Sequence, residues 1–332
     1  MSETDFSIEA HIEQWPLKVP FVIARSSRTH VETVLVEVRQ AGFTGRGECQ
    51  PNPRYNHSGE TVVEALDSLE QHLSCLPTPE ELQRLMPAGP ARNALDCALL
   101  DLAAKKSHTR VWQQLALPEP AAVETVYTIS MGNPSEVLQA AQAAWDEGYS
   151  LLKLKLGGAA DMACAQAVRS RLSDARLVAD ANEGWALEDV ASKLRQLADL
   201  GFEMVEQPLP AGQDALLAEI ERPLTVCADE SAVAGVPVAG LADRYDMINI
   251  KLDKTGGLSA ALAMAAEAQL AGMQVMTGCM LGTSLAMAPA HLLAGRCSFA
   301  DLDGALLLRQ DREHAMISSG ALLGAPSPSL WG

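Results

Sequence analysis

Alternating apolar and lysine residues over 151–156 predict a strand whose two faces differ. In Leu-Leu-Lys-Leu-Lys-Leu the lysines are Lys153 and Lys155. Residues i and i+2 of a strand point to the same side, so both ammonium groups project together. A solvated outer face is the ordinary explanation for a single Lys-x-Lys motif. The motif gains meaning only because polar residues recur at regular intervals farther along the chain.

The beginning of the chain has a pattern of its own. Residues 5–50 alternate apolar and polar positions and predict a small antiparallel sheet, with turns at Gly42 and over 45–47. Helical spacing then recurs in three segments: 61–73, 78–86 and 91–104. We therefore expect an α+β unit over residues 1–118. Pro118 and Pro120 mark its end, because proline interrupts regular structure.

After Pro120, short apolar runs alternate with segments of helical spacing. Eight strands are predicted: 123–130, 151–156, 176–180, 203–206, 224–229, 246–251, 273–277 and 298–303. Predicted helices between them are 135–147, 161–172, 187–200 and 259–271. This alternation favours a closed parallel α/β barrel over residues 119–311. An open doubly wound sheet is the alternative, but it requires a glycine-rich phosphate loop after its first strand, and residues 130–134 do not form one.

Charged residues follow the ends of successive predicted strands. Three consecutive strands lead to Asp180, Glu206 and Asp229, and the next ends at Lys251. The intervals of 26, 23 and 22 residues each correspond to about one strand–helix unit. These side chains should therefore meet at the carboxyl-terminal mouth of one barrel.

Three neighbouring carboxylates repel one another unless a cation neutralises them. An all-oxygen set suits a hard cation, Mg²⁺ more than Zn²⁺. A helix N-cap would explain one such aspartate, but explains three successive strand ends poorly. Lys155 and Lys251 come from strands that face each other across a closed barrel, so one could remove a proton and the other return one. We expect mutual repulsion and the cation to lower their pKa values toward working pH.

A family resemblance rests on these motifs together. They are Lys153-Leu-Lys155, Asp180-Ala-Asn182, Glu206-Gln-Pro208, Asp229-Glu-Ser231 and Lys251-Leu-Asp-Lys-Thr-Gly-Gly257. The chain resembles the enolase superfamily in its muconate-lactonizing subgroup, and within it most closely the dipeptide epimerases. The similarity extends over nearly the whole chain, and the ordered set is far more specific than any one motif.

The resemblance implies a (β/α)7β TIM-like barrel with an N-terminal α+β capping domain, completed by residues 312–332. It implies one Mg²⁺ per subunit, bound by Asp180, Glu206 and Asp229. Lys155 and Lys251 would be the two acid/base catalysts of a 1,1-proton transfer through a metal-stabilised enolate. Lys153 would lie near the substrate carboxylate. The implied reaction is epimerisation of the C-terminal residue of dipeptides, with L-Ala-D/L-Glu preferred, in peptidoglycan (cell-wall) recycling.

Substrate-binding residues also follow from the resemblance. Asp301 and Asp303 match an Asp-x-Asp motif that binds the α-ammonium group of the substrate, and two carboxylates at a strand end can pair with a cation. A turn at Asp303-Gly304 is an alternative explanation for Asp303. A glutamyl side chain needs a cationic partner, for which Arg28 and Arg25 are candidates. Residues expected to orient ligands or lysines are Asn182, Glu230 and Asp253.

Two other kinds of function remain open. N-succinylamino-acid racemase, o-succinylbenzoate synthase and muconate cycloisomerase would use the same scaffold, but their substrates lack a free ammonium group and give Asp301 and Asp303 no role. A non-catalytic metal-binding barrel could serve as a binding module. Such a module would not need Lys155 and Lys251 beside its metal.

Composition narrows the range of partners and compartments. A formal charge of −17 and a pI near 4.8 argue against nucleic acid or an anionic membrane surface. We find no secretory leader and no apolar run of membrane-spanning length. The seven cysteines form no Cys-x-x-Cys pair, which predicts reduced thiols in a cytoplasmic protein. The expected partner is a small dipeptide, and assembly into a homo-oligomer is left open.

Overall fold

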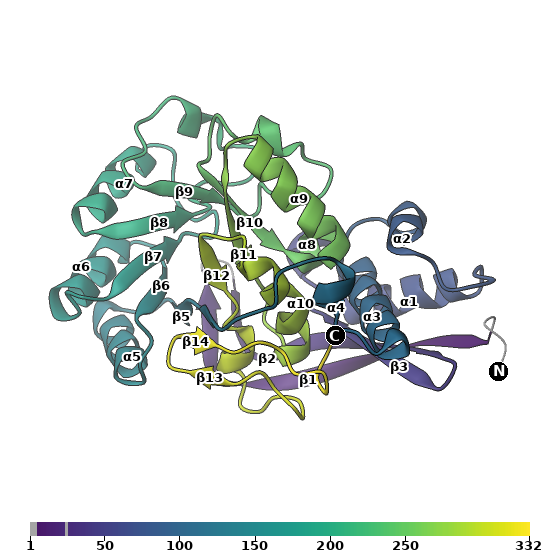
Figure 1. Cartoon of the computed structure of the whole chain (residues 1–332). Helices are drawn as coiled ribbons and strands as arrows, with labels where there is room; N and C mark the ends of the chain where they lie inside the picture. Colours follow the sequence, from purple (N-terminus) through teal and green to yellow (C-terminus); the bar gives the residue numbers. More distant parts are fainter. Residues whose placement is uncertain (1–4, 24–25) are drawn as a thin grey trace.

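Two main sheets organise the chain (Figure 1). A computed structural model describes residues 5–23 and 26–332. The first sheet is antiparallel, in the order β1-β2-β3, and four helices follow it. Their bounds are β1 (Phe6–Ile23), β2 (Ser26–Gln40), β3 (Phe43–Cys49), α1 (Gly59–Glu70), α2 (Pro79–Leu85), α3 (Pro90–Ser107) and α4 (Val111–Gln114). The antiparallel sheet expected over 5–50 is confirmed.

The second sheet has eight parallel strands in sequential order. They are β5 (Tyr127–Ile129), β6 (Leu151–Lys155), β7 (Arg176–Asp180), β8 (Phe202–Glu206), β9 (Thr225–Ala228), β10 (Met247–Lys251), β11 (Gln274–Gly278) and β12 (Phe299–Asp301). A parallel bridge between Thr125 and Ala300 joins the two ends of the series, with Val126 N donating to Ala300 O at 2.8 Å. The predicted closed barrel is thus confirmed, and the open sheet is excluded.

Helices cover the outside of the barrel between most strands (Figure 1). They are α5 (Pro134–Asp146), α6 (Asp161–Arg171), α7 (Val190–Asp199), α8 (Leu252–Thr255), α9 (Leu258–Leu270) and α10 (Ser284–Ala294). Only 3-10 turns follow β8 and β9: Ala215–Ala218 and Val238–Gly240. One layer of apolar side chains fills the barrel interior below the mouth. Seven successive strand segments contribute one buried residue each: Val126, Leu151, Val178, Met204, Cys227, Met247 and Met276. The charged residues of β6, β7, β8 and β10 lie two or more positions farther along their strands, above this layer.

Several details differ from the sequence predictions. The predicted strand 123–130 is divided into two strands of different sheets, Val123–Glu124 and Tyr127–Ile129. Residues 45–47 are no turn but part of β3, where an added Cβ would lie 2.1 Å from Ala98 O at Gly45 and 2.0 Å from Ala94 O at Gly47. These glycines therefore allow α3 to pack closely on the sheet. Helix α7 begins at Val190 rather than 187. Helix α10, which contains Pro289, was not among the predicted helices.

The C-terminal residues return to the N-terminal sheet and its helices. Arg312 pairs with Glu13 and Glu48, and Trp331 Nε1 donates to Cys97 O at 3.0 Å. A small sheet joins β13 (Ser318–Ser319) and β14 (Leu322–Leu323) to β4 (Val123–Glu124). The contacts of Arg312 and Trp331 support our proposal that residues 312–332 complete a capping domain of residues 1–118, with the barrel over 119–311, whereas β14 pairs with a strand of the barrel segment. Among the described helices, none combines the length and hydropathy needed to span a membrane.

Candidate active site

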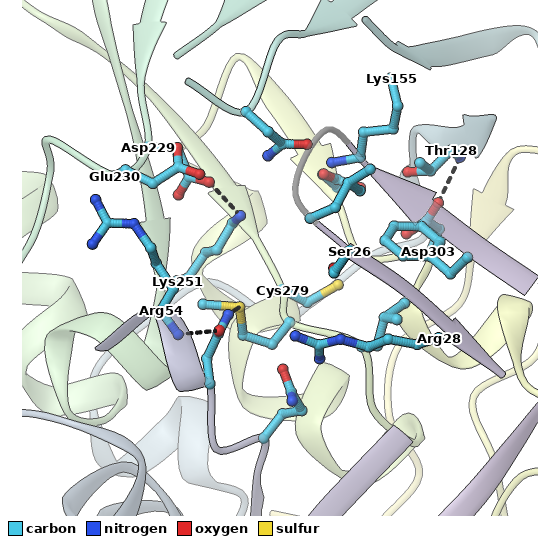
Figure 2. Close-up of a pocket in the computed structure, with 18 of the residues that line it drawn as sticks. Ser26, Arg28, Arg54, Thr128, Lys155, Asp229, Glu230, Lys251, Cys279 and Asp303 are labelled. Atoms are coloured by element: carbon cyan, nitrogen blue, oxygen red, sulfur yellow. Dashed lines mark hydrogen bonds and ion pairs between the residues drawn. The ribbon is translucent and has the colours of Figure 1, made fainter. Parts of the chain in front are cut away.

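One pocket lies at the carboxyl-terminal mouth of the barrel, beneath residues of the N-terminal unit (Figure 2). Its empty space, including the part open to solvent, is about 750 Å³. The barrel contributes charged side chains: Lys153, Lys155, Asp229, Glu230, Lys251, Asp301 and Asp303. The N-terminal unit contributes Phe21, Ile23, Arg28, Gln50, Arg54 and Tyr55. The mouth thus combines cations and anions in one small volume.

Lys153 lies at the centre of this charge cluster and is 1% exposed. Its Nζ atom is 2.9 Å from Glu206 Oε2 and 3.5 Å from Asp180 Oδ2, and it pairs closely with Asp301. Burial alone would lower the pKa of Lys153, but these carboxylates, Asp301 foremost, raise it well above its ordinary value. Lys153 is therefore held as a cation, as a group facing a substrate carboxylate requires.

Lys155 and Lys251 reach the pocket from β6 and β10, which three intervening strands separate in the barrel (Figure 2). Lys155 Nζ lies 2.5 Å from Asp180 Oδ2, and Lys251 Nζ lies 2.6 Å from Asp229 Oδ2. Burial lowers the pKa of Lys251, but Asp229 and Glu206 outweigh it and raise the pKa well above its usual value. The expected lowering is therefore not found for Lys251. It would require another cation to neutralise these carboxylates.

Asp180 and Glu206 are buried at the ends of the adjacent strands β7 and β8, and Asp229 is buried directly after β9. Asp180 and Glu206 are register partners across β7 and β8. Burial would raise the pKa of Asp180, but Lys155 and Lys153 lower it to about 2. The pKa of Asp229 is likewise lowered by Lys251 and Lys254 against the effect of burial. Burial and the neighbouring Asp180 instead raise the pKa of Glu206.

Residues of β10 and α8 orient two of these carboxylates. Asn249 Nδ2 donates to Glu206 Oε1 at 2.6 Å. Lys254 Nζ donates to Asp229 Oδ1 and Asp229 O, both at 2.6 Å, and to Asn249 O at 2.9 Å. All three ammonium protons of Lys254 are thus used, so it acts as a fixed countercharge rather than a base. Neither residue was singled out from sequence, although Asn249 shares the inward face of β10 with Lys251 by period-2 spacing.

The three carboxylates are an all-oxygen set that fits a hard cation. In the structure, however, lysine ammonium groups lie between them: Lys153 between Asp180 and Glu206, and Lys251 near both Glu206 and Asp229. The carboxylates would have to exchange some of these contacts for a shared ion. Their residue types and their burial at the ends of adjacent strands fit that role.

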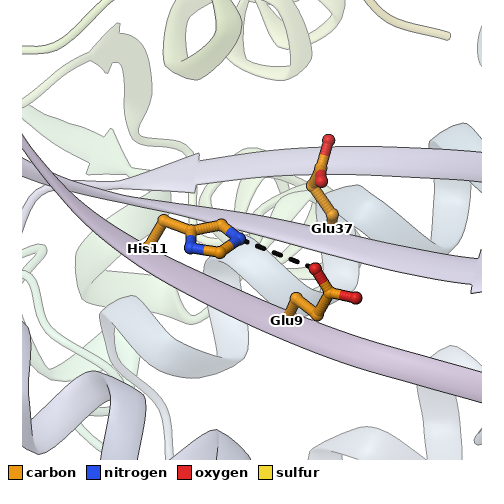
Figure 3. A group of neighbouring side chains, drawn as sticks. All are labelled: Glu9, His11 and Glu37. Carbon is orange, nitrogen blue, oxygen red and sulfur yellow. Dashed lines mark ion pairs between the residues drawn. The ribbon is translucent and has the colours of Figure 1, made fainter.

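A second acidic group lies outside the pocket, on strands β1 and β2 of the N-terminal sheet (Figure 3). Over residues 5–23 and 26–332, Glu9, His11 and Glu37 are the only three metal-ligand-type residues with ligand atoms within 4.8 Å of one another. Arg39 pairs with Glu9 and Glu37, each at 2.6 Å. This solvent-accessible arginine already offsets part of the negative charge of the group, which we interpret as surface ion pairing.

Asp301 and Asp303 line the pocket beside Thr128. Asp301 Oδ2 pairs with Lys153, whereas its buried Oδ1 has no hydrogen-bond partner among the described residues. Asp303 Oδ2 accepts from Thr128 N at 2.6 Å (Figure 2) and makes no helix-capping bond, so the turn explanation does not account for its side chain. Burial, then Asp301, raises the pKa of Asp303 to about 7.

The other predicted residues divide into four cases. Arg28 lines the pocket, and no described carboxylate pairs with it. Arg25 lies outside the described residues. Asn182 and Glu230 line the pocket, and Asn182 N donates to Asp180 Oδ1 at 2.9 Å. Asp253 lies behind the pocket wall, bonded to the N-terminal unit rather than to a lysine.

Comparisons with known proteins agree with this geometry. Residues 7–116 match the mandelate racemase / muconate lactonizing enzyme N-terminal domain, and residues 136–315 match the enolase C-terminal domain-like family. The chain is 45% identical to the L-Ala-D/L-Glu epimerase of Escherichia coli K12, covering 93% of this chain and 97% of that one. It is 37% identical to the N-acetyl-D-glutamate racemase of a Pseudoalteromonas species, covering 90% and 95%.

A solved structure extends the similarity to three dimensions. It is an enolase family member from Agrobacterium tumefaciens with homology to dipeptide epimerases, containing sodium and L-Ala-L-Glu. The TM-score is 0.93 at 45% identity, covering 99% of this chain and 100% of the other. Two domain matches, high identity over the full length and a shared barrel lead to one conclusion: the chain belongs to the enolase superfamily, within its mandelate racemase / muconate-lactonizing group.

Proposed function

We propose that the protein epimerises the C-terminal residue of dipeptides, with L-Ala-D-Glu and L-Ala-L-Glu preferred. The observation that carries the proposal is the placement of Lys155 and Lys251 on separated strands around one pocket, each beside a buried carboxylate. Two bases flanking one α-carbon allow a proton to leave one face and another to arrive at the opposite face. Similarity to an L-Ala-D/L-Glu epimerase supports this reading.

The proton transfer divides between the two lysines. One amine, unprotonated, accepts the α-proton, and the electron pair of the broken C–H bond remains on the substrate, delocalised into its carboxylate. The other lysine, protonated, delivers its proton to the opposite face. Lys153, fixed as a cation by its carboxylate neighbours, faces the negative charge that develops on the substrate carboxylate.

Asp180, Glu206 and Asp229 would hold a Mg²⁺ ion. Bound there, the ion supplies positive charge that neutralises the carboxylates and the substrate carboxylate. Oxygen-only ligands support Mg²⁺ as the cation. Asn249 and Lys254 orient two of the three ligand carboxylates from behind. Asn182 and Glu230 belong to the same wall of the pocket.

Opposite charges at the pocket wall would orient a dipeptide. The unpartnered oxygen of Asp301, with Asp303 beside it, provides acceptors for the α-ammonium group. Arg28 provides a cation for the γ-carboxylate of a C-terminal glutamyl residue. Burial lowers the pKa of Arg28, but arginine remains charged. The predicted role of Arg25 stays a prediction.

A dipeptide of this kind points to a role in peptidoglycan recycling in the cytoplasm. The seven unpaired cysteines support a reducing compartment. Whether the enzyme works as a homo-oligomer stays open. The dipeptide assignment implies no nucleic-acid or membrane partner.

Racemisation of N-acylglutamate is the second candidate, because a racemase of N-acetyl-D-glutamate is 37% identical to this chain. It would use the same lysines and carboxylates. Its substrate has no ammonium group, however, and would place an uncharged acyl group near Asp301 and Asp303. Asp301 Oδ1, which is buried and unpartnered, favours a cationic substrate group.

Proton NMR in D₂O with Mg²⁺ tests the proposal. L-Ala-L-Glu should lose its Glu α-proton signal while the L,D epimer appears, and both changes should require the metal. N-acetylglutamate and N-succinyl amino acids serve as parallel substrates. Exchange confined to the acylated compounds would replace the proposal by the second candidate, and absence of exchange in all of them would refute both.

A further inference from the structure

Helix α3, on the capping side, holds the segment that follows Lys251, from the end of α8 to the start of α9. Arg92 Nη2 donates to Thr255 O at 2.7 Å, and Arg92 Nε donates to Gly256 O at 3.0 Å. One turn farther along α3, Asp96 accepts from Ser259 Oγ at 2.7 Å and from Ser259 N at 3.1 Å. These bonds join sequence positions more than 160 apart. The N-terminal unit is therefore fastened to the segment that carries Lys251.

The close approach of α3 explains the two glycines of the Lys-Leu-Asp-Lys-Thr-Gly-Gly motif. Gly256 and Gly257 have φ values of +80° and +115°. A Cβ atom at Gly256 would lie 2.4 Å from Arg92 Nε, and one at Gly257 would lie 2.5 Å from Asp96 Oδ2. Only glycine combines this backbone conformation with room for the helix. The motif is thus built for contact with α3 as well as for proton transfer.

Asp253 is the one carboxylate of this motif, and it too faces the capping side. Its Oδ1 accepts from Asn93 Nδ2 at 2.7 Å, and its Oδ2 accepts from Gln50 N at 3.3 Å. Among residues 5–23 and 26–332, no cation forms an ion pair with Asp253. Burial raises the pKa of this carboxyl to about 7. A half-buried carboxyl group with only neutral donors costs free energy when it is ionised, which suggests that it is kept for a purpose other than stability.

Gln50, the second partner of Asp253, belongs to the pocket wall. Gln50 lines the pocket and begins the segment that contributes Asn52, Arg54 and Tyr55 to the same wall. Arg54 forms a double hydrogen bond to Glu183, at 2.9 and 3.1 Å, across the mouth. Asp253 therefore connects a pocket-lining segment of the capping side with the turn directly after Lys251.

We propose that Asp253 is a positioning residue for Lys251, and that its bonds to Asn93 and Gln50 set the amine of Lys251 relative to the substrate held by the capping segment. The inference rests on the proposed two-lysine reaction. Asp253 touches neither substrate nor reacting atoms in this assignment. Its effect passes through the backbone of α8, whose first residue follows Lys251 directly.

A defect confined to one epimer distinguishes a positioning role of Asp253 from a general effect on the stability of the protein. Lys251 serves one face of the α-carbon and Lys155 the other, so displacement of Lys251 alone should slow exchange from one epimer only. The Asn93→Asp variant sets a carboxylate against Asp253. We expect exchange from the epimer that depends on Lys251 to fall about tenfold or more, as when a group supporting an active-site residue is lost. Exchange from the other epimer should change less than about threefold.

A reciprocal exchange of the two side chains provides the rescue. In the double variant Asn93→Asp/Asp253→Asn, the new amide at position 253 can donate to the new carboxylate at position 93, and its oxygen can accept from Gln50 N. Exchange from the affected epimer should recover toward the wild-type rate. Ser259→Ala is the matched control, because it removes a bond between α3 and the same segment without involving Asp253. It should leave the ratio of the two exchange rates unchanged.

The measurement is α-proton exchange in D₂O from L-Ala-L-Glu and L-Ala-D-Glu separately, with the Lys251→Ala variant showing which epimer depends on Lys251. Equal loss from both epimers in Asn93→Asp, or no rescue by the double variant, would overturn the inference while leaving the proposed function intact. Failure of the wild-type protein to exchange either epimer would overturn the proposed function, and the inference with it. If Asn93→Asp does not fold, Asn93→Leu removes the same donor at similar size and is judged by the same ratio.

Discussion

Lys155 and Asp180 are register partners across the parallel strands β6 and β7, and the Nζ atom of Lys155 lies 2.5 Å from Asp180 Oδ2. A proton-transfer group of the proposed reaction is thus paired with a proposed metal ligand. The arrangement is repeated by Lys251 and Asp229 at 2.6 Å on the far side of the carboxylates. Each lysine consequently has its own carboxylate neighbour, and each can be tested separately.

Replacing either lysine by alanine should remove exchange from one epimer. Lys155→Ala should lower α-proton exchange from one of L-Ala-L-Glu and L-Ala-D-Glu by about a thousandfold, the loss expected for a general base. Lys251→Ala should do the same to the other epimer, and both variants should lose net epimerisation. The measurement is deuterium incorporation by NMR. Equal residual exchange from both epimers in the Lys155 variant would contradict the assignment of one base to each face.

Asp303→Asn should discriminate between substrate classes. Loss of a negative charge near the substrate ammonium should reduce kcat/KM for L-Ala-L-Glu by about tenfold or more, the effect of a lost charge-assisted hydrogen bond. Activity toward N-acetylglutamate, which lacks that ammonium group, should fall much less. The asparagine oxygen can still accept from Thr128 N, so the local backbone bond is retained. An equal loss for both substrates would favour the N-acylglutamate racemase alternative.

Arg28→Met tests recognition of the glutamyl side chain. The change keeps an unbranched apolar chain but removes the cation, so kcat/KM for L-Ala-L-Glu should fall by about ten- to a hundredfold. A dipeptide with an uncharged C-terminal residue, such as L-Ala-L-Leu, should be far less affected. Parallel steady-state kinetics on the two substrates make this comparison. If both substrates lose activity alike, Arg28 has no specific role in binding the γ-carboxylate.

Glu206→Gln should weaken Mg²⁺ binding. Loss of one unit of negative charge at ion-contact distance is expected to reduce affinity by about a hundredfold or more. Isothermal titration calorimetry on folded protein measures this without reference to activity. Glu37→Gln is the control, because it alters the surface group beside Glu9 and His11 and should leave the affinity unchanged. Weaker Mg²⁺ binding in Glu37→Gln, with unchanged binding in Glu206→Gln, would place the metal site on the N-terminal sheet instead.

Asp253 makes a testable contribution to the pH dependence of stability. Because its folded-state pKa is about 7 and an unfolded aspartate titrates near 3.9, the native state binds more protons between these values. Its contribution to the free energy of unfolding therefore decreases as pH rises through that window. Between pH 5 and pH 8 the decrease should be about 2–3 kcal/mol smaller in Asp253→Asn than in wild type. Urea unfolding at both pH values measures this difference. An identical decrease in the free energy of unfolding in both proteins would contradict the raised pKa.

Local patterns were sufficient for the barrel and for its charged mouth. Period-2 alternation places Lys153 and Lys155 on one face of β6, and spacing by strand–helix units brings Asp180, Glu206 and Asp229 to the ends of adjacent strands. These are short-range consequences of strand geometry and repeated connection length. They do not depend on which side chains pack against them.

Contacts between distant segments could be found only in the tertiary structure. The glycines at 45 and 47 were mistaken for a turn. They are needed because α3 packs closely on β3, and the α3 residues that they contact lie about 50 positions farther along the chain. The pKa of Lys251 was expected to be lowered by repulsion between the lysines and by the cation, whereas Asp229 and Glu206 lie near enough to raise it when no ion neutralises them. Asp253 could be proposed as an orienting residue, but its partners lie far away in the sequence: Asn93 on α3 and Gln50 directly after β3. Sequence periodicity determines the direction in which each side chain leaves its own strand. The packing of strands and helices decides which charged and hydrogen-bonding groups surround that side chain, and therefore its pKa and its position.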